Sequence, residues 1–302
     1  MVPSALPYYD ADAVMSLGYA AATDAIVRAL REGVDPAIGP ARSIVELAHG
    51  QMLLMPAETT TATGIKVVTV AAGNPTRGLP LVHAQYLLFD RTTLAPTAVL
   101  DGTALTTLRT PAVSVAAVLH RLPDRPIHLV VIGHGPQAQG HVAAFAAVRP
   151  LASSTYLVRD PARATVDGVA LGSAEARRRL HEADVIVCAT TARTPVLRSA
   201  DVRDDAIVVA VGAYEPDARE LDGALLARST VVVEDIATAL REAGDVALAI
   251  TEGALAADTL VSMRDLVLGT VSAPRDRPLV LKTVGMAWED LAVAEAVVAS
   301  SG

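Results

Sequence analysis

The sequence predicts an α/β protein, with a doubly wound parallel sheet and a second, mixed α+β domain. From Ile127 onward, short apolar runs alternate with stretches of helical periodicity, which is typical of a parallel sheet with right-handed crossovers. Before that point, β-like runs follow one another directly, separated by Gly, Pro and Asn turns. The first part of the chain is therefore expected to form a mostly antiparallel or mixed sheet.

Composition and charge narrow the classes of function. The chain has 302 residues, which suits two domains of ordinary size. Hydrophobic residues make up 52% of the chain and aromatic residues only 3%. Ala and Val dominate, so the expected core has small side chains, as in parallel strands covered by helices. The formal net charge is -8 and no basic run interrupts it, which disfavours nucleic acid as a partner because phosphate binding needs clustered Lys and Arg.

Cysteine use and targeting patterns are also informative. Cys188 is the single cysteine, which excludes an intrachain disulfide and the usual cysteine metal clusters. A reducing, cytoplasmic location is expected. The first residues lack the pattern of a signal peptide, and no apolar run reaches the ~18 residues that would indicate a membrane span. No Ser-His-Asp arrangement or metal-ligand spacing stands out, so no metal is expected.

The first part of the chain is expected to begin with a helix. Apolar residues recur at helical spacing from Val14 to Leu30, Asp10 or Asp12 can cap the start, and Gly33 and Pro36 end the pattern. A second helix is expected from Thr103 onward. The β-like runs between these helices are at residues 43–48, 51–57, 64–71, 81–90 and 97–101.

The second part alternates strands with helices. Strands are expected at residues 127–133, 154–160, 184–191, 206–212 and 229–235. Helical segments are expected at residues 136–148 and 173–183, with further helical stretches between the later strands. Residues 279–300 are expected to form a strand or loop followed by an amphipathic helix.

A glycine-rich turn follows the first strand of this second part. Gly133, Gly135 and Ala138 stand in G-x-G-x-x-A order between a strand and a helix. In a dinucleotide-binding turn, the first glycine permits the tight turn, the second lets a pyrophosphate approach the backbone, and the third position keeps helix and strand close. The helix N-terminus then offers free N–H groups to the anion. The pattern predicts a nicotinamide dinucleotide site on a Rossmann-type domain, with a turn that holds no ligand as the alternative.

The end of the next strand bears on the choice between NAD and NADP. NAD sites usually place an acid at this tip, whereas NADP sites place an arginine nearby. The tip position is Val158, followed by Arg159 and, slightly further on, Arg163, whose guanidinium groups suit a 2′-phosphate. NADPH is therefore favoured and NADH remains possible, because a shift of one residue would make Asp160 a ribose acceptor. Both arginines would otherwise be solvated charges at a helix start.

Three cations stand in or beside apolar stretches of the first part. Lys66 lies in GIKVVTV, Arg109 in TTLRTPAV, and Arg42 between Pro40 and a β-like run. Buried cations need partners, and an arginine can hold a substrate carboxylate through two parallel hydrogen bonds. Burial and neighbouring cations would lower the pKa of Lys66, which would let it exchange protons with an imine or amine. Each cation taken alone would more often be a surface or salt-bridged residue, and a lone histidine such as His83 or His141 is more often structural.

Taken together, these segments resemble the ornithine cyclodeaminase/mu-crystallin family over nearly the full length of the chain. The combination of T-x-L-R-T-x-A-x-S and G-x-G-x-Q-A in this order is highly specific. The matching pieces are PARS at Pro40–Ser43, GIKVVTVAAGNPTRGLP at Gly64–Pro80, LLFD at Leu87–Asp90, LDGTALTTLRTPAVS at Leu100–Ser114, VIGHGPQAQGH at Val131–His141, VGAYEPDARELD at Val211–Asp222, EAGDV at Glu242–Val246 and KTVGMAWEDLA at Lys282–Ala292.

The resemblance implies a homodimer with a discontinuous first domain. Residues 1–117 with 283–302 would form the substrate-binding and dimerisation domain, and residues 118–282 the dinucleotide-binding Rossmann domain. It implies that Arg42, Lys66 and Arg109 surround a substrate carboxylate, with Lys66 near the reacting carbon–nitrogen bond. The residues expected at the cofactor are His83, Arg109, Thr110, Gly133, Gly135, Pro136, Gln137, Ala138, Arg159, Arg163, Thr190 and Thr283.

One departure from the family pattern affects the expected reaction. Cyclodeaminases of the family carry an Asp shortly after the V-G pair, and Tyr214 occupies that position here. Asp217 follows three residues later, and the ketimine-reductase and pyrroline-carboxylate-reductase branches also lack the earlier Asp. The leading hypothesis is therefore an NAD(P)H-dependent reductase of cyclic imino acids such as pyrroline-2-carboxylate or piperideine-2-carboxylate. The alternatives are ornithine cyclodeaminase activity, reductive amination like that of alanine dehydrogenase, and a non-catalytic NADP-binding protein.

Overall fold

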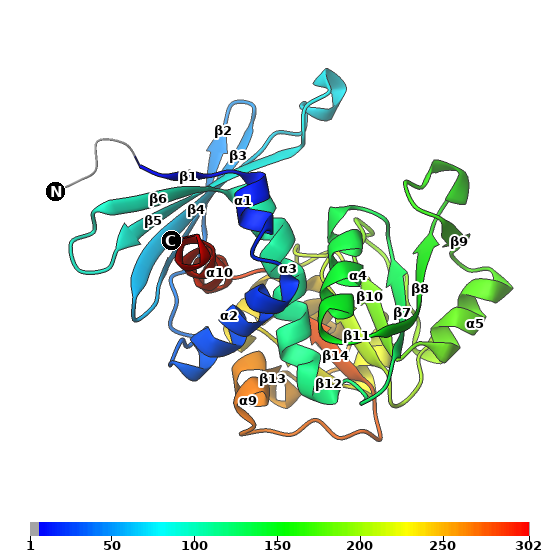
Figure 1. The fold of residues 1–302 in the computed structure, drawn as a ribbon. Helices are drawn as coiled ribbons and strands as arrows, with labels where there is room; N and C mark the ends of the chain where they lie inside the picture. The colour runs from blue at the N-terminus through cyan, green and yellow to red at the C-terminus, as the bar shows by residue number, and fades with distance from the viewer. Residues whose placement is uncertain (1–5, 302) are drawn as a thin grey trace. The chain divides into compact units, whose positions relative to one another are not determined.

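A computed structural model describes residues 6–301 of the chain (Figure 1). Its internal contacts divide the chain into two compact units. The first unit comprises Met1–Val113 with Gly285–Gly302, and the second comprises Ser114–Val284. The N-terminal unit is thus completed by the C-terminal segment, and the last helix belongs with the first part of the chain. Among the described residues, no helix is long and apolar enough to cross a membrane.

The first unit contains a six-stranded sheet with the order β1-β6-β5-β4-β3-β2. Neighbouring strands run antiparallel except for β1 and β6, which are parallel, so the predicted mixed sheet is confirmed. Its strands are β1 (Tyr8–Tyr9), β2 (Ser43–Leu47), β3 (Gly50–Glu58), β4 (Ala62–Val70), β5 (Val82–Asp90) and β6 (Pro96–Asp101).

Helices cover this sheet. The last helix, α10 (Ala287–Ser300), packs against β3, β4 and β5 and against α2 (Tyr19–Arg31), as Figure 1 shows. Nearly every residue in the first half of α10 is buried, because the helix lies between the sheet and α2. This position lets its polar side chains reach the centre of the sheet.

The expected first helix is wrong in one respect, because the structure divides it. The short helix α1 (Ala11–Met15) begins at Asp10, whose side chain accepts a hydrogen bond from the Ala13 N–H. Gly18 then adopts a φ of 74°, a left-handed conformation that L-residues disfavour, and α2 begins after it. The apolar residues keep their helical spacing across this glycine, so the sequence pattern did not reveal the break.

The helix α3 (Gly102–Val118) follows β6, and the boundary between the two units lies within it. The second unit then contains eight parallel strands in the order β13-β12-β14-β11-β10-β7-β8-β9. They are β7 (Ile127–Ile132), β8 (Leu151–Val158), β9 (Gly168–Ala170), β10 (Val185–Cys188), β11 (Ile207–Ala210), β12 (Thr230–Val233), β13 (Val261–Ser262) and β14 (Leu279–Lys282).

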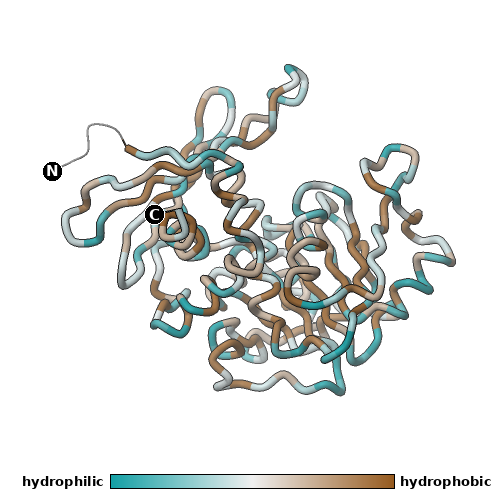
Figure 2. The backbone as a smooth tube through the Cα atoms, in the orientation of Figure 1, coloured by the Kyte–Doolittle hydropathy of each residue, from teal (hydrophilic) through white to brown (hydrophobic). Residues whose placement is uncertain are grey.

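Both faces of the parallel sheet are buried. Along β7, for example, Leu129 and Val131 alternate with Val130 and Ile132, and all four are at most 2% exposed. Hydrophobic residues follow the strands in Figure 2, as expected for a sheet with helices on both sides. The helices of this unit are α4 (Pro136–Val148), α5 (Ala174–Glu182), α6 (Gly223–Ala227), α7 (Ile236–Glu242), α8 (Gly244–Thr251) and α9 (Met263–Leu268).

This sheet confirms the predicted fold class, and its strand order indicates where a ligand would be expected. From β7 the chain moves to β8 and β9 on one side, then returns to β10 and β11 on the other side. The strand order therefore reverses between β7 and β10. In doubly wound sheets, ligands bind at the carboxyl ends of the strands, at such a reversal.

Candidate active site

The glycine turn has the geometry that a pyrophosphate site needs. Gly133 has a φ of 119°, and a Cβ there would collide with the Ala189 carbonyl, so only glycine fits this turn. Gly135 caps α4 without any side-chain hydrogen bond, and a Cβ added to it would meet nothing within 4 Å. Ala138 is fully buried where the helix crosses the sheet. There is thus open space beside the cap of α4, and a helix N-terminus of this kind suits an anion.

His141 holds α4 in place. Its Nδ1 lies 2.7 Å from the Gln137 carbonyl and its Nε2 lies 2.9 Å from the Ser114 hydroxyl. A carbonyl only accepts, so Nδ1 carries the proton and Nε2 accepts from the hydroxyl. Burial lowers the pKa of His141 to about 4, which keeps the ring neutral. His141 is accordingly a structural residue of the helix that forms the turn.

The strand β8 ends at the residue that the sequence analysis took as its tip. The strand ends at Val158, which is buried, and Arg159 and Arg163 follow as exposed side chains. Asp160 uses its carboxylate to accept the Ala162 N–H at 3.0 Å, in a short helical turn. Arg159 and Arg163 are thus the exposed cations that follow the tip of β8.

Thr190 and Thr283, both predicted at the cofactor, follow parallel strands of the second unit. Thr190 comes two residues after β10, and Thr283 comes directly after β14. Thr190 donates from its N–H and its hydroxyl to Oε1 of Glu220, at 2.8 and 2.7 Å. Its backbone and side chain are thus fixed at the carboxyl edge of the sheet.

Lys66 lies in the middle of β4 in the first unit and is 2% exposed. Its Nζ is 2.7 Å from Oδ2 of Asp290 on α10 and donates to the Thr106 hydroxyl at 3.3 Å. Burial lowers the pKa of Lys66 to about 8; the carboxylate of Asp290 opposes this shift and the charge of Arg109 adds to it. A lysine with this pKa exchanges protons near neutral pH, as a general acid requires.

Arg109, on α3, is held by the same helix. Its Nη1 lies 2.6 Å from Oε2 of Glu289, and its Nε lies 3.1 Å from Oδ1 of Asp290. Both carboxylates are fully buried. Asp290 therefore joins Lys66 to Arg109 and sets the separation of the two cations.

Arg42 joins this group through the backbone. Its Nη2 donates to the Gly285 carbonyl at 2.7 Å. Gly285 has a φ of 80°, and a Cβ there would lie 2.7 Å from Nη2 of Arg109, so a glycine is required between the two arginines. The structure thus brings the three predicted cations Arg42, Lys66 and Arg109 together within the first unit.

The cations of this cluster suit a carboxylate ligand. Lys66 and Arg109 pair with two buried carboxylates, Glu289 and Asp290, and Arg42 lies beside them on the Gly285 carbonyl. A guanidinium group holds a carboxylate through two parallel hydrogen bonds, so two arginines beside a buried lysine suit a carboxylate ligand. The other two predicted residues of this unit differ in burial, since His83 is exposed on β5 and Thr110 is half-buried beside Arg109 on α3.

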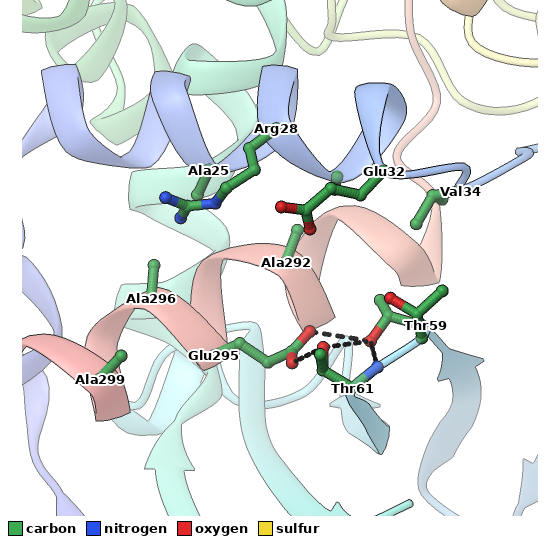
Figure 3. A pocket seen from close by; sticks show the side chains of 12 residues that line it. Ala25, Arg28, Glu32, Val34, Thr59, Thr61, Ala292, Glu295, Ala296 and Ala299 are labelled. Atoms are coloured by element: carbon green, nitrogen blue, oxygen red, sulfur yellow. Dashed lines mark hydrogen bonds between the residues drawn. The ribbon is translucent and has the colours of Figure 1, made fainter.

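A separate hollow in the first unit contains none of the predicted residues (Figure 3). It has a volume of about 260 Å³ between α2, α10 and the turn before β4. Glu295 accepts hydrogen bonds from the hydroxyls of Thr59 and Thr61 there, so its carboxylate fastens α10 to this turn. The rest of the lining is five alanines with Arg28, Glu32, Val34 and Thr60.

The segment that distinguishes cyclodeaminases carries no buried acid at the expected place. Tyr214 is 57% exposed. Asp217 is an exposed residue paired with Arg193, and Glu215 pairs with the same arginine. Neither carboxylate replaces the aspartate that the cyclodeaminase pattern places at position 214.

The second unit has the doubly wound sheet of dinucleotide-binding domains, and the first unit holds a cluster of buried cations. Together they indicate an oxidoreductase as the class of protein. The model of the ornithine cyclodeaminase/mu-crystallin family matches residues 13–301, and the chain belongs to this family. It is 34% identical to Delta(1)-pyrroline-2-carboxylate reductase 2 of Burkholderia ambifaria, over 96% of this chain and 94% of the relative. It is 32% identical to ketimine reductase mu-crystallin of Mus musculus, over 85% and 83% of the two chains.

A solved structure agrees with these relatives. The Thermococcus litoralis Delta(1)-pyrroline-2-carboxylate reductase, in complex with NADH and L-proline, superimposes with a TM-score of 0.87 and is 28% identical. The match covers 98% of this chain and 97% of that chain. The fold and the family predicted from the sequence are therefore confirmed.

Several residues of the cluster and of the sheet edge were not singled out from the sequence. Glu289 and Asp290 are adjacent acids in a mostly apolar helix, a pattern that indicates buried ion pairs because acids are almost never buried alone. Lys282 is the only lysine of the chain besides Lys66, and it stands at the end of an apolar run. It is paired with Asp245 at 3.0 Å, close to Glu220.

Proposed function

We propose that the chain is an NAD(P)H-dependent reductase of cyclic ketimines that carry a carboxylate, such as pyrroline-2-carboxylate or piperideine-2-carboxylate. The observation that carries the proposal is Lys66, a buried lysine with a pKa lowered to about 8 beside Arg109 and Arg42. The cyclic imino acids in the names of two relatives have the two groups that such a cluster serves, a carboxylate and a basic nitrogen.

The arginines bind and orient the substrate. Arg109 and Arg42 supply guanidinium groups, which bind a carboxylate through paired hydrogen bonds. Arg109 keeps its orientation because Glu289 and Asp290 hold it from the other side. Fixing the carboxylate fixes the ring, so the imine nitrogen is directed to one place.

Lys66 supplies the proton at the ring nitrogen. A protonated imine is the better electrophile, so an ammonium beside the nitrogen promotes attack on the adjacent carbon. Its contacts to Asp290 and Thr106 leave a third N–H for the substrate. When bound, the reduced nicotinamide supplies the hydride. Gly133, Gly135, Pro136, Gln137 and Ala138 would hold its pyrophosphate, with His83, Thr110, Thr190 and Thr283 as further contacts.

A direct assay tests this function. The purified chain is incubated with NADPH or NADH and each of a panel of cyclic imino acids, linear 2-oxo acids with amines, and ornithine. Oxidation of the cofactor with a cyclic imino acid supports the proposal. Ammonia release from ornithine without net cofactor consumption would instead identify a cyclodeaminase, and cofactor binding without any turnover would indicate a binding protein.

Gly135→Val is expected to abolish cofactor binding. The added side chain projects from the cap of α4 into the space proposed for the pyrophosphate. It meets no protein atom within 4 Å at Cβ, so the fold should tolerate it. Fluorescence titration with NADPH measures the loss, with the melting temperature as a check on folding. Unchanged affinity in the variant would show that the pyrophosphate binds elsewhere.

NADPH is expected to bind more tightly than NADH. Arg159 and Arg163 follow the tip of β8 as exposed guanidinium groups, and a charge-assisted contact to a 2′-phosphate contributes about 1.5–3 kcal/mol. The double variant Arg159→Ser, Arg163→Ser should lose this preference while its affinity for NADH stays near that of the parent. Titrations of parent and variant with both cofactors measure it. Equal affinities in the parent would contradict the assignment.

A homodimer in a reducing, cytoplasmic setting completes the proposal. The edge strand β2 supports the dimer, because its apolar residues Ile44, Val45 and Leu47 are 42–55% exposed. An uncovered apolar edge strand is a liability unless another chain pairs with it. The single buried Cys188 supports the setting. Sedimentation equilibrium at low micromolar concentration tests the dimer, and a monomer there would contradict it.

A further inference from the structure

Three charged side chains are buried at the carboxyl edge of the parallel sheet, and the proposed reaction does not use them. Glu220, Asp245 and Lys282 are each at most 1% exposed. Lys282 ends β14, and Glu220 contacts the segments that follow β10 and β11. Buried charges are costly, so their retention at this edge calls for a reason.

Glu220 ties two loops together. Its Oε1 accepts from the N–H and the hydroxyl of Thr190, and its Oε2 accepts from the N–H of Gly212 at 2.7 Å. Backbone N–H groups only donate, so both oxygens act as acceptors and the ionised carboxylate fits the site. Gly212 is confined as well, because a Cβ there would lie 2.6 Å from Glu220.

Asp245 and Lys282 support this carboxylate. Oδ1 of Asp245 accepts the N–H groups of Glu220 and Leu221 at 2.7 and 2.8 Å. Oδ2 of Asp245 lies 3.0 Å from Nζ of Lys282, which also donates to the Ala213 carbonyl. Two carboxylates thus face one ammonium, and the group carries one uncompensated negative charge.

The position of this charge follows from the strand order. The glycine turn after β7 is the proposed pyrophosphate site, and the tip of β8 is the proposed ribose-phosphate site of the adenosine half. The dinucleotide crosses the sheet at the reversal between β7 and β10, so its nicotinamide half extends over the loops after β10 and β11. Those are the two loops that Glu220 joins.

We propose that Glu220 is a positioning residue that fixes the two nicotinamide-side loops and whose uncompensated charge favours the cationic, oxidised nicotinamide ring over the neutral, reduced ring. The inference depends on the proposed dinucleotide site in this unit. A negative charge fixed in a buried environment stabilises a developing positive charge without reorganisation. The same charge therefore assists the loss of hydride from the reduced ring.

Glu220→Gln removes the negative charge of Glu220 and also changes its contacts to the two loops, so it tests both parts of the proposal. Dissociation constants of the oxidised and reduced cofactor are measured by fluorescence titration and calorimetry, without substrate. The oxidised form is expected to lose affinity more than the reduced form, by a factor on the order of ten. Glu215→Gln is the matched control, because Glu215 is an exposed carboxylate on the same segment and is paired with Arg193. The ratio of its two dissociation constants, for oxidised and reduced cofactor, should equal that of the parent.

Asp245→Asn separates charge from loop geometry. Its Oδ1 can still accept the N–H groups of Glu220 and Leu221, while the group loses one negative charge. Asp245→Asn should shift the ratio of the two dissociation constants in the same direction as Glu220→Gln. If Glu220→Gln does not fold, Asp245→Asn alone tests the effect of the charge. An unchanged ratio of affinities in folded Asp245→Asn, or an equal loss for both cofactor forms in folded Glu220→Gln, would overturn the proposal. If the parent binds neither form, the proposed function itself is wrong.

Discussion

Arg109→Lys is expected to lower kcat/KM for the preferred cyclic ketimine by about 10- to 100-fold, as loss of a charge-assisted hydrogen bond predicts. A lysine keeps the positive charge but presents a single ammonium. It cannot hold Glu289 and Asp290 with two separate nitrogens and also present a planar fork to the substrate carboxylate. The loss should appear mainly in KM, because the proton at the ring nitrogen comes from Lys66.

Steady-state kinetics on the parent and Arg109→Lys measure this effect, with cofactor affinity titrated in parallel. Arg91→Lys is the matched control, since Arg91 forms an exposed ion pair with Glu58 and is about half exposed. It should leave the kinetics unchanged, because exposed pairs contribute little. Normal kinetics in Arg109→Lys would remove Arg109 from the proposed substrate site.

Local sequence pattern was sufficient for most elements of the fold. The main strands of the second unit are short, continuous apolar runs, and helical stretches alternate with them, so these elements were predictable one by one. The break at Gly18 was not, because the apolar periodicity continues through it. The three-residue strand β9 was also missed, since Gly168–Ala170 is too short to show any period.

The candidate site was predictable in part for a similar reason. Cations inside apolar runs indicate buried charges that need partners, which identified Lys66 and Arg109. Their partners lie far away in the sequence, with Arg109 and Asp290 separated by 181 positions. No local pattern in the sequence shows which acid pairs with which cation. The roles of Glu289, Asp290 and the group around Glu220 could therefore be identified only from the structure.

Lys66→Arg is expected to reduce turnover at saturating ketimine by about 10²- to 10⁴-fold, the usual contribution of a general acid. An arginine keeps the charge that faces Asp290 and the substrate carboxylate, so binding should change less than turnover. It does not release its proton at any working pH, so it cannot protonate the imine nitrogen. Single-turnover kinetics at saturating substrate and cofactor measure the loss apart from product release.

The pH dependence provides a second, independent measurement. The proton donor is the ammonium form of Lys66, which is present below its pKa of about 8. The rate of ketimine reduction by the parent should therefore be constant at pH values below this pKa and fall as the pH rises through it. Asp290 raises this pKa, so Asp290→Asn should move the descending limb to lower pH.

The two variants together decide the role of Lys66. If Lys66 only neutralises the carboxylate, Lys66→Arg will retain near-parent turnover and the same descending limb, because the charge is unchanged. If Lys66 donates the proton, Lys66→Arg will lose both turnover and this limb, and Asp290→Asn will keep the limb but shift it. A limb that persists unshifted in both variants belongs to another group, and the imine proton must then come from that group or from water.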